Sequence, residues 1–259
     1  MDNNNNWTKK KIIHKIWINF KGTEEGKNPS IVLLNKQSRC QLMNPDYHIK
    51  MWNEEEADAL MRREFPNYYA MWKSYTFPIQ RVDTLKYFLM YLYGGLYMDM
   101  DIECLKPFGD YFDLDKVYLV EETSCISPYK FNNFLIGSPQ KHPFWLYVFK
   151  ELEESMVNMQ NFDTMHILES SGPGVVQRAY EKYCFRNSNE DFHILPKELF
   201  NPCDVCGNMS SSVNSAYLVH ESNVSWSESA KFMAFFMCNK TIIIIIVIFL
   251  ALLFIYSSE

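Results

Sequence analysis

The sequence lacks the signatures of several large enzyme and binding classes. It has no G-x-x-x-x-G-K-[ST] loop and no G-x-G-x-x-G fingerprint, so the usual signs of Walker nucleotide hydrolysis and dinucleotide redox chemistry are missing. A G-x-S-x-G elbow and an H-E-x-x-H helix are missing too. The only basic tract is at residues 9–11, and the net charge is -6, so we expect no nucleic-acid partner. A small ligand or a lipid is the expected partner.

Cysteines are few and irregularly spaced. There are seven, an odd number, and the first residues show no secretory pattern, so we expect no disulfide framework. Cys203 and Cys206 form a lone C-x-x-C without a second pair or histidines at ligand spacing. We interpret them as two thiols in a loop rather than a zinc site.

One globular domain accounts for most of the chain. Its 259 residues are 47% hydrophobic, which is enough for one sizeable core but not comfortably for two. Residues 1–10 are polar and Asn-rich, and we expect them to be disordered. We place the folded domain at residues 11–230.

The C-terminal segment predicts a membrane anchor. Residues 242–256 contain only apolar residues and Tyr, and the segment 232–256 is long enough to cross a bilayer as a helix. Lys231 and Lys240 lie on its N-terminal side, which favours a single-pass protein with its globular part in the cytosol. A buried terminal helix is the alternative.

The pattern of the remaining chain predicts an α/β domain, because short β-branched runs alternate with helical stripes. The expected strands cover 12–18, 47–52, 96–103, 116–120, 132–137, 192–195 and 216–219. The expected helices cover 30–40, 54–65, 78–93, 142–156 and 175–183. Pro78 suits a helix start, and Gly94 with Gly95 suits its end.

The strongest chemical lead follows this double glycine. In a strand over 96–103, alternation would place Asp99, Asp101 and Glu103 on one face. Carboxylates held away from water need a counter-charge, and oxygen ligands of this kind suit Mg²⁺ or Mn²⁺. The alternative is an exposed edge strand with solvated acids.

Six segments form an ordered set of motifs, namely 11–17, 44–47, 81–83, 94–101, 172–174 and His220 with 225–226. This set resembles glycosyltransferase family 32, which includes yeast initiating α-1,6-mannosyltransferases and inositol-phosphoceramide mannosyltransferases. The resemblance implies a GT-A fold, in which a Rossmann-like mixed sheet is flanked by helices and binds a nucleotide sugar at the carboxyl ends of its strands. It also implies a metal-dependent, retaining transfer of a hexose, with mannose favoured, to a glycan or glycolipid acceptor.

By the same resemblance, Trp17 would stack on the nucleotide base and Asp83 would bind hydroxyls of the donor sugar. Asp99 would face the sugar and ribose, and Asp101 would bind the Mn²⁺ or Mg²⁺ that bridges the phosphates. Asp99 and His220 would complete the metal ligands.

Three further residues belong to the implied site. Ser225 and Trp226 would close over the diphosphate. Lys86 would join Asp83, Asp99 and Asp101 as a catalytic residue, although the family usually has an arginine there. An ammonium group does not reproduce a bidentate guanidinium contact.

That departure leaves a second function open, a catalytically silent membrane protein that binds nucleotide sugars or lipids. A metal-dependent phosphohydrolase is a third, but it lacks the additional His and Asp ligands that such sites use. The donor could be GDP-mannose or a UDP-hexose. A Golgi or ER lumenal location is the alternative to the cytosol.

Overall fold

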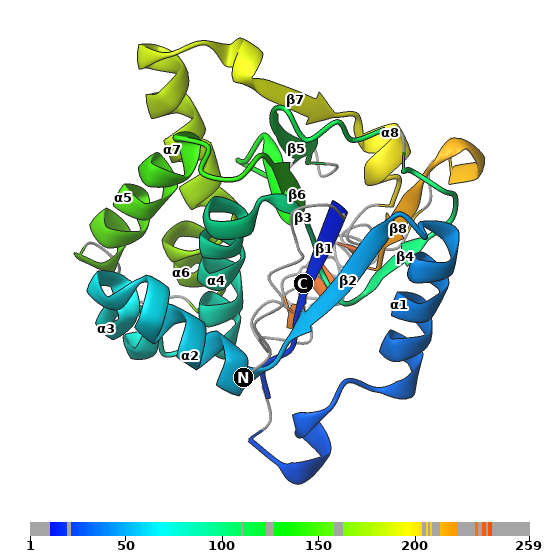
Figure 1. The fold of residues 1–259 in the computed structure, drawn as a ribbon, viewed down its shortest axis with the longest axis horizontal. Coiled ribbons are helices and arrows are strands. Elements are labelled where there is room, and N and C mark those ends of the chain that lie inside the picture. The colour runs from blue at the N-terminus through cyan, green and yellow to red at the C-terminus, as the bar shows by residue number, and fades with distance from the viewer. Residues whose placement is uncertain are drawn as a thin grey trace, which may run out of the picture.

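A six-stranded mixed sheet in the order β2-β1-β3-β6-β5-β7 forms the centre of the fold (Figure 1). The computed structural model describes residues 11–19, 22–109, 111–122, 127–157, 163–203, 206, 208, 213–221, 231–232, 235–236 and 238–239. The strands are β1 Lys11–Ile16, β2 Tyr47–Trp52, β3 Gly95–Met98, β5 Val117–Glu121, β6 Phe131–Ser138 and β7 Phe192–Leu195.

Strand direction fixes where a ligand can bind. β1 is parallel to both β2 and β3, β6 is antiparallel to its neighbours β3 and β5, and β7 is parallel to β5. The chain therefore leaves β1 to one side for β2 and later returns to the other side for β3. Ligands in open α/β sheets bind at such a reversal, at the carboxyl ends of the strands. Trp17 follows β1 there, and Asp99 follows β3.

Helices cover both faces of the sheet (Figure 1). One face carries α2 Glu54–Glu64, α3 Pro66–Ser74, α4 Pro78–Tyr93, α5 Phe144–Val157, α6 Asp163–Ser170 and α7 Pro173–Arg186. The other carries α1 Ile31–Met43, α8 Lys197–Phe200 and a two-stranded sheet of β4 Ile102–Cys104 and β8 Leu218–His220. Short 3-10 helices cover Glu24–Lys27, Asn189–Asp191 and Val213–Ser215.

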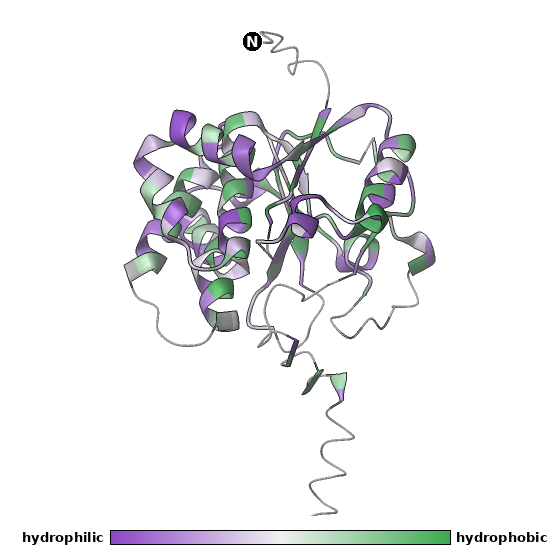
Figure 2. Cartoon of the chain, turned by 90° about the horizontal axis from the view of Figure 1, so that it is seen from below, coloured by the Kyte–Doolittle hydropathy of each residue, from purple (hydrophilic) through white to green (hydrophobic). Residues whose placement is uncertain are grey.

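The two cores follow from strand alternation. In β5, Val117 and Leu119 pack on the helical face, whereas Tyr118 and Val120 pack on the face of α1 and β4. The helices show both hydrophilic and hydrophobic colours (Figure 2), as expected when one face of each helix packs on the sheet.

The double glycine delivers the chain from α4 into β3. Gly94 and Gly95 have φ of +67° and +87°. A Cβ on Gly94 would lie 2.6 Å from Gln140 N, and one on Gly95 would lie 2.6 Å from the Ile12 carbonyl oxygen. Only glycine fits this passage, because it tolerates both the dihedral angles and the close approach of backbone.

The mixed sheet flanked by helices agrees with the expected architecture, and the expected strands and helices are present. The continuous strand over 96–103 is wrong, however. β3 ends at Met98, the chain turns at Asp99–Asp101, and β4 leaves the main sheet to pair with β8. Asp99 and Asp101 therefore lie on a turn, Glu103 lies in β4, and the three acids do not share one strand face. Three helices, α3, α6 and α8, were not predicted.

The absence of disulfides was also predicted wrongly. Cys40 pairs with Cys104, and Cys206 pairs with Cys238. Among the described cysteines, Cys184 is a free thiol. The fold brings α1 against β4, and cysteine spacing cannot reveal that contact.

The predicted ends of the chain are largely undescribed. Residues 1–10 and most of 232–256 lie outside the described residues. In the part of the chain that is described, no helix has the length and apolar character needed to cross a membrane.

Candidate active site

The turn after β3 places two carboxylates at the carboxyl edge of the sheet. The Ile102 N–H donates to the Asp99 carbonyl at 3.3 Å, which closes the turn, and the Asp99 N–H donates to Phe134 of β6 at 2.8 Å. Asp99 and Asp101 therefore leave the sheet beside each other, held by backbone bonds on both sides of the turn.

The small second sheet brings His220 to this turn. In the β4–β8 pair, Ile102 lies opposite His220. His220 Nε2 consequently lies 3.2 Å from Asp101 Oδ1 and 3.9 Å from Asp99 Oδ2. The imidazole stacks on Phe134, with ring centroids 4.2 Å apart.

These three side chains fit a divalent cation. One ligand atom from each of Asp99, Asp101 and His220 falls within 4.8 Å of the others. Two carboxylates and an imidazole suit Mn²⁺, and the carboxylates also suit Mg²⁺. Burial opposes the charged imidazolium, but the hydrogen bond that it donates to Asp101 and the charges of Asp101 and Asp99 outweigh burial and raise the pKa of His220.

A buried ion pair adjoins the carboxylates. Lys86 Nζ lies 2.7 Å from Asp83 Oδ1 and 3.7 Å from Asp99 Oδ1. Asp83 and Lys86 are 5% and 1% exposed, so this i,i+3 ion pair lies out of solvent. Burial disfavours the charged ammonium, but the carboxylates of Asp83 and Asp99 outweigh it and raise the pKa of Lys86.

Protein donors satisfy both oxygens of Asp83. Asn133 Nδ2 donates to Oδ1 at 3.1 Å, and Ser171 Oγ donates to Oδ2 at 3.2 Å. Burial raises the pKa of the Asp83 carboxyl, and Lys86 offsets part of that rise. Asp83 thus joins α4, β6 and the 171–172 turn in one network. Its predicted contact with the donor sugar remains a prediction.

Lys15 of β1 supports the turn Asp99–Asp101, which we call the acid turn. Its Nζ donates to the Asp99 carbonyl oxygen at 2.8 Å, and its side chain is fully buried. Burial lowers the pKa of this ammonium to about 7, and the charges of Asp99 and Asp101 oppose the fall. Tyr97 donates to Asp99 Oδ1 at 2.6 Å, so this acid is held through both its carbonyl and its carboxylate.

Trp17 is positioned at the same edge. Its backbone N–H donates to Trp52 at 2.9 Å, and its indole Nε1 donates to Gly26 at 3.0 Å. The ring is half-buried beyond the end of β1. Ser225 and Trp226 lie outside the described residues, so their predicted closing role stays a prediction.

Sequence reasoning missed three residues of this network, namely Lys15, Asn133 and Ser171. A lysine inside the apolar run of β1 was the available signal, because a buried ammonium needs a partner. Asn133 and Ser171 gave no comparable signal.

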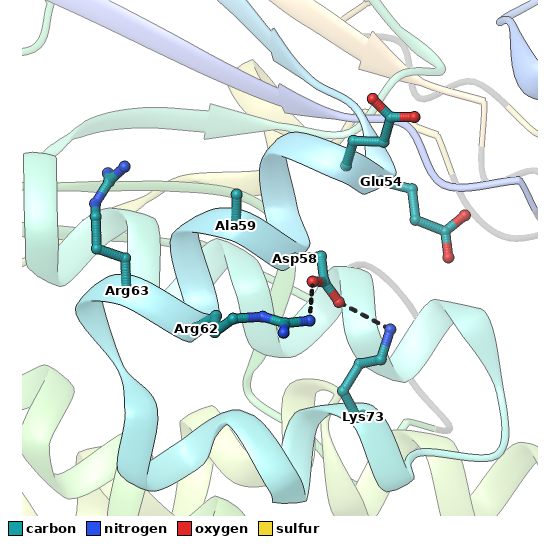
Figure 3. A pocket seen from close by; sticks show the side chains of 7 residues that line it. Glu54, Asp58, Ala59, Arg62, Arg63 and Lys73 are labelled. Atoms are coloured by element: carbon teal, nitrogen blue, oxygen red, sulfur yellow. Dashed lines mark hydrogen bonds and ion pairs between the residues drawn. The ribbon is translucent and has the colours of Figure 1, made fainter.

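A charged groove lies between α2 and α3, apart from this network (Figure 3). None of the candidate site residues lines it. Asp58 holds both Arg62 and Lys73 there, at 2.9 and 2.8 Å. Because Asp58, Arg62 and Lys73 are already paired with one another, the groove offers no chemistry comparable to that of the acid turn.

The acid turn lies within the part of the chain that matches a protein family. Residues 32–124 match the family described as "Glycosyltransferase sugar-binding region containing DXD motif". Over this region the chain is similar to glycosyltransferases that carry a DXD motif. This region spans α1, the acid turn and β5 but not His220.

Similar proteins support the class. An uncharacterized glycosyltransferase, L373, of Acanthamoeba polyphaga mimivirus is 27% identical over 91% of this chain and 90% of its own length. Mannosyl phosphorylinositol ceramide synthase CSH1 of Saccharomyces cerevisiae is 31% identical over 61% of this chain, and inositol phosphoceramide mannosyltransferase 3 of Schizosaccharomyces pombe is 25% identical over 88%. The chain spans 42% and 59% of the lengths of these two yeast proteins.

Solved structures are more distant. The PaToxG glycosyltransferase is 20% identical with a TM-score of 0.49, covering 68% of this chain and 70% of its own. The UDP-bound glycosyltransferase domain of the YGT toxin is 7% identical with a TM-score of 0.49, covering 89% of each chain.

Proposed function

We propose that the protein is a metal-dependent, retaining glycosyltransferase that moves a hexose, with mannose favoured, from a nucleotide-diphosphate sugar to a glycan or glycolipid. The observation that carries the proposal is the convergence of Asp99, Asp101 and His220 at the carboxyl edge of the sheet. This convergence lies where the strand order reverses, beside the end of β3.

The barrier in such a reaction is the charge that accumulates on the departing diphosphate. A bound Mn²⁺ or Mg²⁺ supplies Lewis-acid stabilisation of that charge. Asp101, Asp99 and His220 would hold the ion. The protein itself contributes a fixed turn, since Lys15 and Tyr97 hold Asp99 in one orientation before any ligand arrives.

The donor would lie between the end of β1 and the acid turn. Trp17 would stack on the base, and Asp83 with Lys86 would orient the sugar next to Asp99. Ser225 and Trp226 would cover the diphosphate. GDP-mannose is the preferred donor because two similar proteins are named as inositol phosphoceramide mannosyltransferases or synthases, and a UDP-hexose is the alternative.

A membrane lipid is the acceptor we favour. The names of the yeast proteins refer to the mannosylation of inositol phosphoceramide, a lipid, and the predicted anchor at 232–256 would hold the domain at a bilayer. Two disulfides favour the Golgi or ER lumen over the cytosol, because disulfides persist in oxidising compartments.

A catalytically silent binding protein has little support. That alternative was motivated by Lys86 alone, and Lys86 forms ion pairs with both Asp83 and Asp99. The family match does not favour it either.

A donor screen tests the proposal. Thermal unfolding of the purified full chain should be measured with GDP-mannose, UDP-glucose and UDP-galactose, each with and without Mn²⁺. One donor should raise the midpoint only when Mn²⁺ is present, because tight ligands stabilise by mass action. That donor should then be hydrolysed or transferred. Stabilisation without turnover on a panel of acceptors would favour the silent alternative, and no stabilisation by any donor would overturn the proposal.

A further inference from the structure

Three neighbouring side chains of α1 contact the segments that carry the candidate metal ligands, which we call the metal frame: the acid turn, β4 and the end of β8. We call Lys36, Gln37 and Cys40 the α1 clamp. Each contacts a different part of the metal frame. Their bonds go to a backbone carbonyl, to Glu221 and to Cys104 rather than to the side chains of Asp99, Asp101 or His220.

Gln37 holds the centre of the acid turn. Its Nε2 donates to the carbonyl oxygen of Met100 at 2.8 Å, and also to Leu33 of its own helix at 3.1 Å. Met100 lies between the two acids. Gln37 is 9% exposed, so water competes poorly for the Met100 carbonyl.

Lys36 contacts the end of β8, which carries His220. Its ammonium forms an ion pair with Glu221, the residue directly after His220. The side chains of Lys36 and Glu221 are 10% and 49% exposed, so the pair is partly buried. Partly buried pairs are screened less than surface pairs. Lys36 therefore ties α1 to the end of β8, next to the imidazole.

Cys40 fixes the strand that joins the two halves. Its disulfide to Cys104 attaches α1 to the last residue of β4. The nearby Arg39–Glu103 pair at 2.6 Å is more exposed, 57% on the arginine side, and adds little by comparison. One rigid helix thus contacts the acid turn, β4 and the end of β8.

We propose that the α1 clamp positions the metal ligands: Gln37 orients the Asp99–Asp101 turn and Lys36 places His220 through Glu221. Both are positioning residues, since neither would touch the metal. The inference rests on the proposed metal site. Partners that orient ligands in this way typically change metal affinity by about 10- to 100-fold when they are removed.

Calorimetric titration of the full chain with Mn²⁺, without donor, tests the clamp. The Gln37→Leu variant keeps the side-chain size but leaves the Met100 carbonyl unbonded, and its Mn²⁺ affinity should fall about 10-fold. Gln41→Leu is the matched control. Gln41 lies on the same helix and donates to Tyr47 at 2.7 Å, away from the metal frame. Its loss should lower the unfolding midpoint without changing Mn²⁺ affinity.

Lys36 gives a second, independent comparison that also serves if Gln37→Leu does not fold. Lys36→Met should weaken Mn²⁺ binding, whereas Lys36→Arg should restore it by keeping a cation opposite Glu221. Unfolding midpoints of all metal-free variants separate a loss of stability from a loss of affinity.

The outcomes are distinct. Unchanged Mn²⁺ affinity in both Gln37→Leu and Lys36→Met would overturn the clamp, and so would an equal loss in Gln41→Leu. If the unaltered protein binds no Mn²⁺, the proposed metal site fails and the clamp fails with it.

Discussion

His220 Nε2 lies 3.2 Å from Asp101 Oδ1, although one residue ends β8 and the other precedes β4 far earlier in the chain. The contact exists because β8 pairs with β4, which leaves the main sheet immediately after the acid turn. A single antiparallel pairing of short strands therefore completes the candidate metal site. Changes at this pairing should act on metal binding before they act on the fold as a whole.

Metal binding should depend on pH through His220. The nearby acids raise the pKa of His220 above 6.5, and a metal ligand must be deprotonated. Mn²⁺ affinity should therefore fall as the pH is lowered through this raised pKa, and binding should release protons. Calorimetry in buffers of different ionisation enthalpy measures both effects.

The stability of the metal-free protein should depend on pH in the opposite direction from its Mn²⁺ affinity. A raised pKa contributes stability that is fully present below the ordinary value of 6.5 and is lost as the pH rises through the folded-state pKa. A His220→Asn variant should bind Mn²⁺ more weakly and without this pH dependence. Equal pH dependence in this variant and the unaltered protein would rule out His220 as the titrating ligand.

Loss of Lys86 should strongly destabilise the fold. Lys86→Met leaves the buried Asp83 carboxylate without its ammonium partner, which typically costs about 3–5 kcal/mol of unfolding free energy. The double variant Asp83→Asn with Lys86→Met removes both charges and should recover much of this loss. Urea unfolding measures both, and a double variant no more stable than Lys86→Met would contradict the ion-pair account.

Much of the fold was predictable from local pattern. β2 and β7 have the predicted bounds, and α4 begins at Pro78 and ends at the double glycine as expected. Alternation and capping are local properties, so the sequence carries them directly. The end of β3 at Met98 was not predicted, because it depends on the pairing of β4 with β8, which is distant in the sequence.

The site was predictable only in part. The two acids stood out because carboxylates followed an apolar helix and a double glycine, and the expectation for His220 came from a family resemblance. Lys15 and Gln37 were not found, since their role depends on one contact each with a backbone carbonyl. Such contacts leave no periodic trace in the sequence.

The Cys40–Cys104 disulfide should contribute substantially to stability. It joins residues 64 apart, and constraining a loop of that size in the unfolded chain is worth up to about 4 kcal/mol. Replacing both cysteines by alanine should lower the unfolding free energy measured in urea. Cys184→Ala is the control, because Cys184 is a free thiol, and it should change stability by about 0.5 kcal/mol or less. Equal effects of the two replacements would contradict the pairing.

Acid should destabilise the protein through His14. Trp52 Nε1 donates to His14 Nδ1 at 3.0 Å, so Nε2 must carry the proton that is donated to the Gly94 carbonyl. Burial lowers the pKa of His14 to about 4, with Lys50 adding to the effect. The folded state therefore resists protonation, and stability should fall as the pH drops from about 6.5 towards about 4.

A His14→Leu variant separates this effect from general acid unfolding. Its unfolding free energy should depend less on pH over the same interval, even if it is lower throughout. An identical pH dependence in the variant would show that His14 is not responsible.

The most direct test of the central claim is the rate of sugar transfer from the stabilising donor in the presence of Mn²⁺, measured for Asp101→Asn and Glu103→Gln. Asp101 lies beside His220, whereas Glu103 pairs with Arg39 on the outside of β4. Asp101→Asn should lose activity by about 100-fold or more, and Glu103→Gln should keep most of it. A fully active Asp101→Asn variant would contradict the assignment of the acid turn as the metal and diphosphate site.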